Sequence, residues 1–240
     1  MSDAAAARRQ FGESVTSSDV AGLQGPLARA AAVVYTLLVV ELLLLLTTAP
    51  GLILLILLDR DASNVPLAAA CAIPLGPALS AALYALARRR PDLTDLRPAA
   101  AFWRGYRLNV GGVLRVWIPF LIVLTIVTVN LTHLGAAGVP TWWAAPLGLI
   151  AAVAILWAAN ALVITSLFAF RTVDVARLAA YFLVHKGRVT LGNAGLLLVA
   201  AGVTVVSSEA VLMLLASMLA AAVLLIARPM TTEVQERFTA

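Results

Sequence analysis

The chain has 240 residues, of which 62% are hydrophobic and only 12% are charged, with a net charge of +5. A soluble domain of this length is about 45–50% apolar and about a quarter charged, so this composition excludes an ordinary water-soluble fold and indicates a membrane protein. The cations lie in clusters between apolar runs, which is typical of membrane topology signals, so we expect no nucleic-acid partner.

The chain begins with a polar segment, residues 1–28, that we expect to be a disordered cytoplasmic tail. The apolar run that follows is far longer than the core of a signal peptide, about 7–15 residues, so we expect it to be retained as the first span. A transmembrane bundle over 29–229 and a short cytoplasmic tail at 230–240 complete the predicted layout. At about 20 apolar residues per crossing, the predicted spans are 30–58, 65–87, 112–132, 144–170, 190–206 and 209–228.

The predicted fold class is therefore all-α, a polytopic transmembrane helical bundle of about six spans. The last two spans are joined only by Ser207–Ala210, and a five-span chain that merges them is the alternative. With six spans, every Lys and Arg except Arg60 falls on one side of the membrane, whereas five spans would move Arg228 and Arg237 to the other side. Since cations mark the cytoplasmic side, this favours six spans with both ends cytoplasmic.

Helix-breaking residues interrupt two of the predicted spans. Pro50-Gly51 should kink or end the first span, and Pro74, Gly76 and Pro77 should break the second near its outer third. A discontinuous helix exposes backbone groups that can bind a substrate. The alternative, which we favour, is a kink that packing absorbs.

Two cytoplasmic connections should form short interfacial helices. These are Pro98–Leu108 and Thr172–Lys186, and the second places Val175, Leu178 and Phe182 on one face. We expect the arginines of both segments to face anionic lipid headgroups, which makes the lipid bilayer the first partner. A docking surface for a cytoplasmic protein is the alternative.

Glu41 is the only ionisable residue deep in a predicted span. At about 1.5 Å per residue, Glu41 lies about 16 Å deep, and Asn160 and Ser217 lie about 15 Å deep. These three residues are our candidate site, either for a proton, a cation or a small polar substrate. The alternative is structural: an uncharged Glu41 that bonds Asn160 and Ser217 and so fixes the helix register.

Soluble-type catalysis has little support in the sequence. His133 and His185 fall on opposite sides of the predicted membrane, Cys71 is the only cysteine, and no phosphate-binding glycine loop is present. We therefore expect no enzyme activity, no metal and no cofactor. A weaker hypothesis is an enzyme for a lipid-linked substrate at the cytoplasmic face near Arg104, Arg107 and Asn109.

Two segments carry a family resemblance. One is Pro74-Leu-Gly-Pro-Ala-Leu-Ser-Ala-Ala-Leu-Tyr84, and the other is Phe102-Trp-Arg-Gly-Tyr-Arg-Leu-Asn109. From about residue 30 onward, this ordered pair and the helix layout resemble the YesL-like family of bacterial integral membrane proteins. The residues that match the family motifs are Gly76, Pro77, Tyr84, Phe102, Trp103, Arg104 and Asn109.

The resemblance implies an ill-defined role. The family is a domain of unknown function whose genes often lie beside genes of carbohydrate uptake and polysaccharide degradation. This implies an accessory to ABC-type carbohydrate uptake, partnered with a sugar-transport permease in the bacterial cell (inner) membrane. Members often have Asn in the first helix where this chain has Glu41, so a shared role of that position is open. A small secondary carrier that uses Glu41, or a structural membrane protein, is the alternative.

Overall fold

The computed structural model describes residues 26–59, 61–88 and 97–238, and within these ranges the chain forms helices and turns without strands. This confirms the all-α class. The predicted tail at 1–28 lies almost wholly outside the described residues. The helices are α2 (Pro26–Leu57), α3 (Val65–Cys71), α4 (Leu75–Ala87), α5 (Pro98–His133), α6 (Ala144–Leu167), α7 (Thr172–His185), α8 (Gly187–Val206), α9 (Glu209–Leu214) and α10 (Ala216–Phe238), with short 3-10 helices at Ala62–Asn64 and Thr141–Trp143.

Among the described residues, six helical segments are long and apolar enough to cross a bilayer, as the sequence predicts. They are Leu27–Leu57, Ala62–Ala87, Pro98–His133, Thr141–Leu167, Gly187–Val206 and Ala216–Arg237. Their outward faces carry large apolar side chains, such as Leu42 on α2 and Leu149 on α6, which are both 66% exposed. Contiguous apolar surface of this kind suits contact with lipid tails and not with water.

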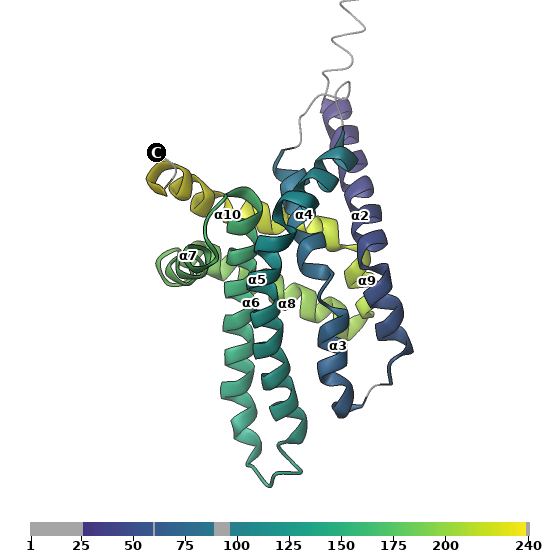
Figure 1. Cartoon of the computed structure of the whole chain (residues 1–240), viewed down its shortest axis with the longest axis vertical. Coiled ribbons are helices and arrows are strands. Elements are labelled where there is room, and N and C mark those ends of the chain that lie inside the picture. Colours follow the sequence, from purple (N-terminus) through teal and green to yellow (C-terminus); the bar gives the residue numbers. More distant parts are fainter. Residues whose placement is uncertain (1–25, 60, 89–96, 239–240) are drawn as a thin grey trace, which may run out of the picture.

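The helices differ in direction, as Figure 1 shows. α5 and α6 form a long antiparallel hairpin, and α2 runs beside α3 and α4. The last hairpin is different, because α8 and α10 run across the other helices at a steep inclination (Figure 1). α7 lies on the outside, where it packs against α6 and α8. The C-terminal hairpin therefore leaves an apolar cavity between itself and α4, α5 and α6.

The predicted break in the second span is present. α3 ends at Cys71 and α4 begins at Leu75, after Pro74. The indole Nε1 of Trp117 donates a hydrogen bond to the carbonyl oxygen of Ala72, 3.0 Å away, inside this break. Because the indole satisfies this backbone carbonyl, packing absorbs the break. In the first span, by contrast, α2 continues through Pro50 to Leu57 and does not end there.

Two other elements differ from the prediction. Residues 98–108, expected as a separate interfacial helix, are the first turns of α5, because a continuous helix satisfies every backbone group without a break. The last span, predicted at 209–228, is interrupted at Leu215, and α10 then continues to Phe238. The helix predicted at Thr172–Lys186 is present as the separate α7, with Val175 and Phe182 buried.

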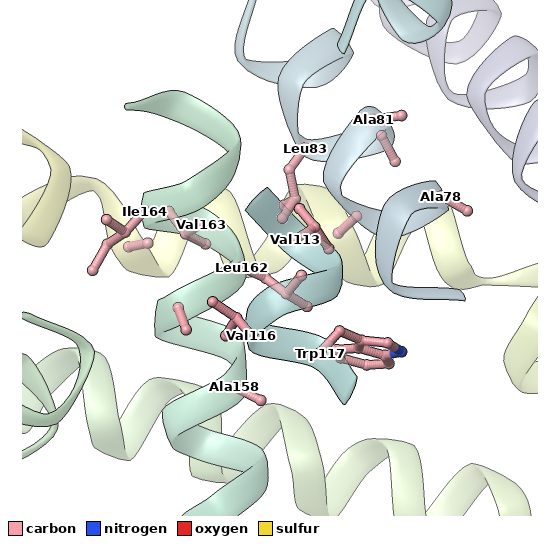
Figure 2. Close-up of a cluster of buried hydrophobic side chains, with 14 of the residues drawn as sticks. Ala78, Ala81, Leu83, Val113, Val116, Trp117, Ala158, Leu162, Val163 and Ile164 are labelled. Atoms are coloured by element: carbon pink, nitrogen blue, oxygen red, sulfur yellow. The ribbon is translucent and has the colours of Figure 1, made fainter. Parts of the chain in front are cut away.

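α4 lies at the centre of the fold, and ten of its thirteen residues are buried. It packs against α2, α5, α6 and α10. Figure 2 shows the cluster at its junction with α5 and α6. Small residues such as Ala78 and Ala81, both fully buried, let the neighbouring backbones approach closely, as membrane helix packing requires. The labelled members are Ala78, Ala81, Leu83, Val113, Val116, Trp117, Ala158, Leu162, Val163 and Ile164.

Candidate functional site

The first polar contact of the site joins α2 to α10. The backbone N–H of Ser217 donates a hydrogen bond to Oε2 of Glu41, 2.7 Å away. Ser217 is the second residue of α10, where the interruption at Leu215 leaves backbone N–H groups without a carbonyl partner in the preceding turn. The Glu41 side chain therefore caps α10, and the positive end of the helix dipole favours an anionic or acceptor group at this position.

The second oxygen of Glu41, Oε1, differs from Oε2 in its hydrogen bonding. Oε1 is buried and has no hydrogen-bond partner among the residues that the structure describes. A buried polar atom without a partner is unfavourable. The two oxygens of Glu41 therefore differ, since Oε2 is bonded to the start of α10 and Oε1 is not bonded within the described part of the chain.

The second polar contact joins α6 to α8. Nδ2 of Asn193 donates a hydrogen bond to Oδ1 of Asn160, 3.3 Å away. Both side chains are buried, with 1% of Asn160 and 5% of Asn193 exposed. The remaining polar atoms, Nδ2 of Asn160 and Oδ1 of Asn193, have no hydrogen-bond partner within the described ranges. Asn193 was not predicted from the sequence, although an amide within an apolar run is a signal that could have identified it.

The structure thus brings two of the three predicted residues into contact and places the third elsewhere. Glu41 meets Ser217 through the backbone of Ser217, whereas Asn160 pairs with Asn193. In the part of the chain that the structure describes, no hydrogen bond joins the two pairs. Asn193 lines the apolar cavity, and so does Ala216, the residue before Ser217, whereas Glu41, Asn160 and Ser217 are not among the lining residues.

The glycines of the two family-like segments lie at contacts with aromatic rings. A Cβ atom added to Gly76 would lie 2.5 Å from Cγ of Trp117, and one added to Gly105 would lie 2.7 Å from Cβ of Tyr84. Real Cβ atoms do not approach other atoms so closely. The contact of Gly105 with Tyr84 therefore packs the two segments directly against each other, whereas Gly76 contacts α5 at Trp117, outside the second segment. Glycine is required at both contacts.

Asn109 extends this contact to α6. Its Nδ2 atom donates a hydrogen bond to the backbone carbonyl of Ser166, 3.1 Å away, and the hydroxyl of Ser166 donates to the hydroxyl of Ser80, 2.8 Å away. Phe102 is fully buried, whereas Trp103 and Arg104 are exposed. Most motif residues thus hold α4, α5 and α6 together, and Trp103 and Arg104 are available to lipid or to a partner.

The other polar residues of interest lie apart from this site. His133 and His185 each bond a backbone carbonyl of their own helix, at 2.8 Å and 3.0 Å. Cys71 is a free, half-buried thiol in α3. Within 26–59, 61–88 and 97–238, no three His, Cys, Asp or Glu side chains form a group that could hold a metal ion. Lys186 forms an ion pair with Glu233, which joins the start of α8 to the last part of α10.

No family model, no curated protein and no solved structure matches the chain. Function has therefore to be inferred from the chain's own residues.

Proposed function

We propose that this membrane protein is a non-enzymatic accessory to ABC-type carbohydrate uptake that associates with a sugar-transport permease. The proposed location is the bacterial cell membrane, with both ends in the cytoplasm. The observation that carries the proposal is the contact of the two YesL-like segments at Gly105 with Tyr84. A match produced by apolar composition alone gives no reason for Gly105 in one segment to lie where a side chain would overlap Tyr84 in the other.

The surface we propose for the permease is α8. Only 11% of its most apolar stretch of 18 residues is buried, against 28–33% of the corresponding stretch in each of the other five candidate spans. Val189 and Asn193 are its buried residues, and Leu198, Val205 and Val206 are each more than 70% exposed. A span that makes so few contacts within its own chain has apolar surface available for another membrane helix.

Site-specific photocross-linking in living cells tests this proposal. A cross-linking amino acid at Leu198 or Val205 should capture a sugar permease, whereas one at Leu42 or Leu46, exposed on α2, should capture none. Deletion of the gene should lower the uptake of a labelled sugar that enters through that permease. Unchanged uptake of every sugar tested, together with no permease captured from α8, would contradict the proposal.

A small secondary carrier is the second candidate, and Glu41 favours it. Among the described residues its oxygen Oε1 has no hydrogen-bond partner, and an ionisable side chain inside a membrane span is typical of an ion or proton pathway. The purified protein in liposomes should then take up a polar solute when a proton gradient is applied. Glu41→Gln should abolish this uptake and leave the melting temperature nearly unchanged. Uptake that persists in the variant would exclude a role for Glu41 in transport.

A further inference from the structure

One exposed face of α5 carries arginines towards its start and isoleucines towards its end. At 3.6 residues per turn, the six positions fall within a sector of about 100° around the helix. All six side chains are exposed, so this face is not covered by another helix of the chain. We call it the α5 stripe, and its residues are Arg104, Arg107, Arg115, Ile118, Ile122 and Ile126.

The arginine end of the α5 stripe has no compensating acid. α5 contains no Asp or Glu over its whole length, Pro98–His133. Within 26–59, 61–88 and 97–238, none of the three arginines forms an ion pair. Since a guanidinium group stays protonated, this end keeps its positive charges for an anionic ligand. Guanidinium groups bind phosphate through two parallel hydrogen bonds, so a phosphate group suits this end.

Gly111 leaves room for such a group between two of the arginines. Arg107 and Arg115 lie four residues before and after Gly111, about 6 Å along the helix axis on each side. Gly111 is exposed on the same face, and a Cβ atom added to it would have nothing within 4 Å. An anionic group can therefore approach the backbone here and be reached by both long side chains.

The isoleucine end of the α5 stripe indicates that the ligand also has a hydrocarbon part. Ile118, Ile122 and Ile126 are 40%, 54% and 56% exposed and belong to a candidate membrane span. From Arg115 to Ile126 the helix rises about 16 Å, close to half of a hydrocarbon core of about 30 Å. This is the depth of one leaflet, so an acyl chain whose headgroup lies at the arginines can lie along the isoleucines.

We propose that the α5 stripe binds one anionic phospholipid lengthwise. Its phosphate lies over Gly111 between Arg107 and Arg115, Arg104 contacts the outer part of the headgroup, and an acyl chain lies along the isoleucines. A flat interfacial helix at 98–108 would have met headgroups in general, whereas its continuity with the span places arginines and isoleucines on one helix face. The proposal goes beyond the role in carbohydrate uptake and does not depend on it.

Native mass spectrometry of the full chain in a non-ionic detergent tests the proposal. The probes are dioleoylphosphatidylglycerol and dioleoylphosphatidylcholine, which have the same acyl chains and differ in the net charge of the headgroup. The first phosphatidylglycerol should bind with a Kd about tenfold or more below that of phosphatidylcholine, since each arginine near the headgroup contributes about fivefold. Glycerol phosphate, which lacks acyl chains, should not displace the bound lipid.

A pair of double variants tests the role of the arginines. Arg107→Gln/Arg115→Gln should raise the Kd for phosphatidylglycerol about tenfold or more. Arg171→Gln/Arg177→Gln is the matched control, because it removes the same charge from exposed positions beside and within α7. This control should leave the Kd nearly unchanged. An equal loss in both double variants would show general attraction to a positive surface and would overturn the site.

A pair of glycine variants tests the position of the headgroup without a change of charge. Gly111→Phe fills the space between the arginines and should raise the Kd for phosphatidylglycerol several-fold. Gly148→Phe is the control, at an exposed glycine of α6 that also has nothing within 4 Å of an added Cβ. Equal Kd values for these two variants would overturn the placement of the phosphate over Gly111.

The choice of ligand has its own contradicting results. Equal Kd values for phosphatidylglycerol and phosphatidylcholine would overturn the role of the arginines in selecting an anionic lipid. Displacement of the bound lipid by glycerol phosphate would show that a free phosphate suffices, and would overturn the role of the isoleucines.

Discussion

Oε2 of Glu41 accepts a hydrogen bond from the backbone N–H of Ser217, 2.7 Å away, across 176 positions of sequence. This bond ties the first candidate span to the start of α10. It also explains why the helix can be interrupted at Leu215 inside an apolar environment, because the side chain replaces a missing carbonyl partner. The carboxyl group therefore has a structural role through Oε2, while Oε1 has no hydrogen-bond partner in the part of the chain that the structure describes.

Replacing Glu41 tests the structural role of its bond to Ser217. Glu41→Gln retains a carbonyl oxygen for the N–H of Ser217, so we expect little change in stability. Glu41→Leu leaves that N–H unsatisfied and should lower the free energy of unfolding by about 1–3 kcal/mol. Thermal unfolding of both variants in one detergent measures the difference. Equal melting temperatures for the two variants would show that the bond does not stabilise the helix start.

Gly76 and Gly105 should not tolerate a methyl group. Gly76→Ala places its Cβ against Trp117, and Gly105→Ala places its Cβ against Tyr84. Each overlap should destabilise the protein by about 1–3 kcal/mol, the usual range for overpacking. Gly111→Ala in α5 is the matched control, since nothing lies within 4 Å of its added Cβ. Because alanine has a higher helix propensity than glycine, Gly111→Ala should stabilise the protein by up to about 1 kcal/mol. Similar melting temperatures for all three variants would contradict the close contact.

Asn109 should matter through its bond to α6. Asn109→Leu removes the hydrogen bond to the Ser166 carbonyl and should lower the free energy of unfolding by about 1 kcal/mol. Asn130→Leu is the control, because Asn130 is exposed in the same helix and bonds only the preceding turn. Chemical unfolding in mixed micelles measures both variants. A loss no larger than that of the control would mean that the bond contributes nothing.

The ion pair of Lys186 with Glu233 should make a small, salt-dependent contribution. Glu233 is also 3.3 Å from Arg237, and a third of the Lys186 side chain is exposed, so solvent screening limits the interaction. Glu233→Gln should lower the melting temperature slightly at low salt. The difference should shrink at high salt. Glu236→Gln, at an exposed position of the same helix, should have no such effect, and an equal loss in both variants would contradict a specific pair.

The positions of the helices could be predicted from the sequence, whereas several of their contacts could not. Apolar runs and the prolines near Gly76 locate the spans and the break before α4, because these signals are local. The interruption at Leu215 has no local signal, since Leu214, Leu215 and Ala216 are all compatible with a helix. It accompanies the contact with Glu41, which belongs to a distant part of the chain.

The candidate site illustrates the same limit. Counting residues along each span gives depth in the membrane, and depth correctly suggested that Glu41 and Ser217 are neighbours. Depth does not give lateral position, so Asn160 was grouped with Glu41 although its partner is Asn193. Likewise, the interfacial helix expected at 98–108 merged with α5, because local composition does not show whether two helical segments are continuous.

The last hairpin offers the most direct test of whether the chain crosses the membrane six times. α8 and α10 are steeply inclined to the other helices, so the side on which their connection lies decides the count (Figure 1). In a Cys71→Ala background, single cysteines at Ser63, Gly138, Ser208, His185 and Glu236 are treated with a membrane-impermeant maleimide.

Six spans with cytoplasmic ends predict that Ser63→Cys, Gly138→Cys and Ser208→Cys react in intact cells, and that His185→Cys and Glu236→Cys react only after the membrane is opened. If Ser208→Cys is protected in intact cells together with Glu236→Cys, the last hairpin does not cross the membrane and the six-span account is wrong.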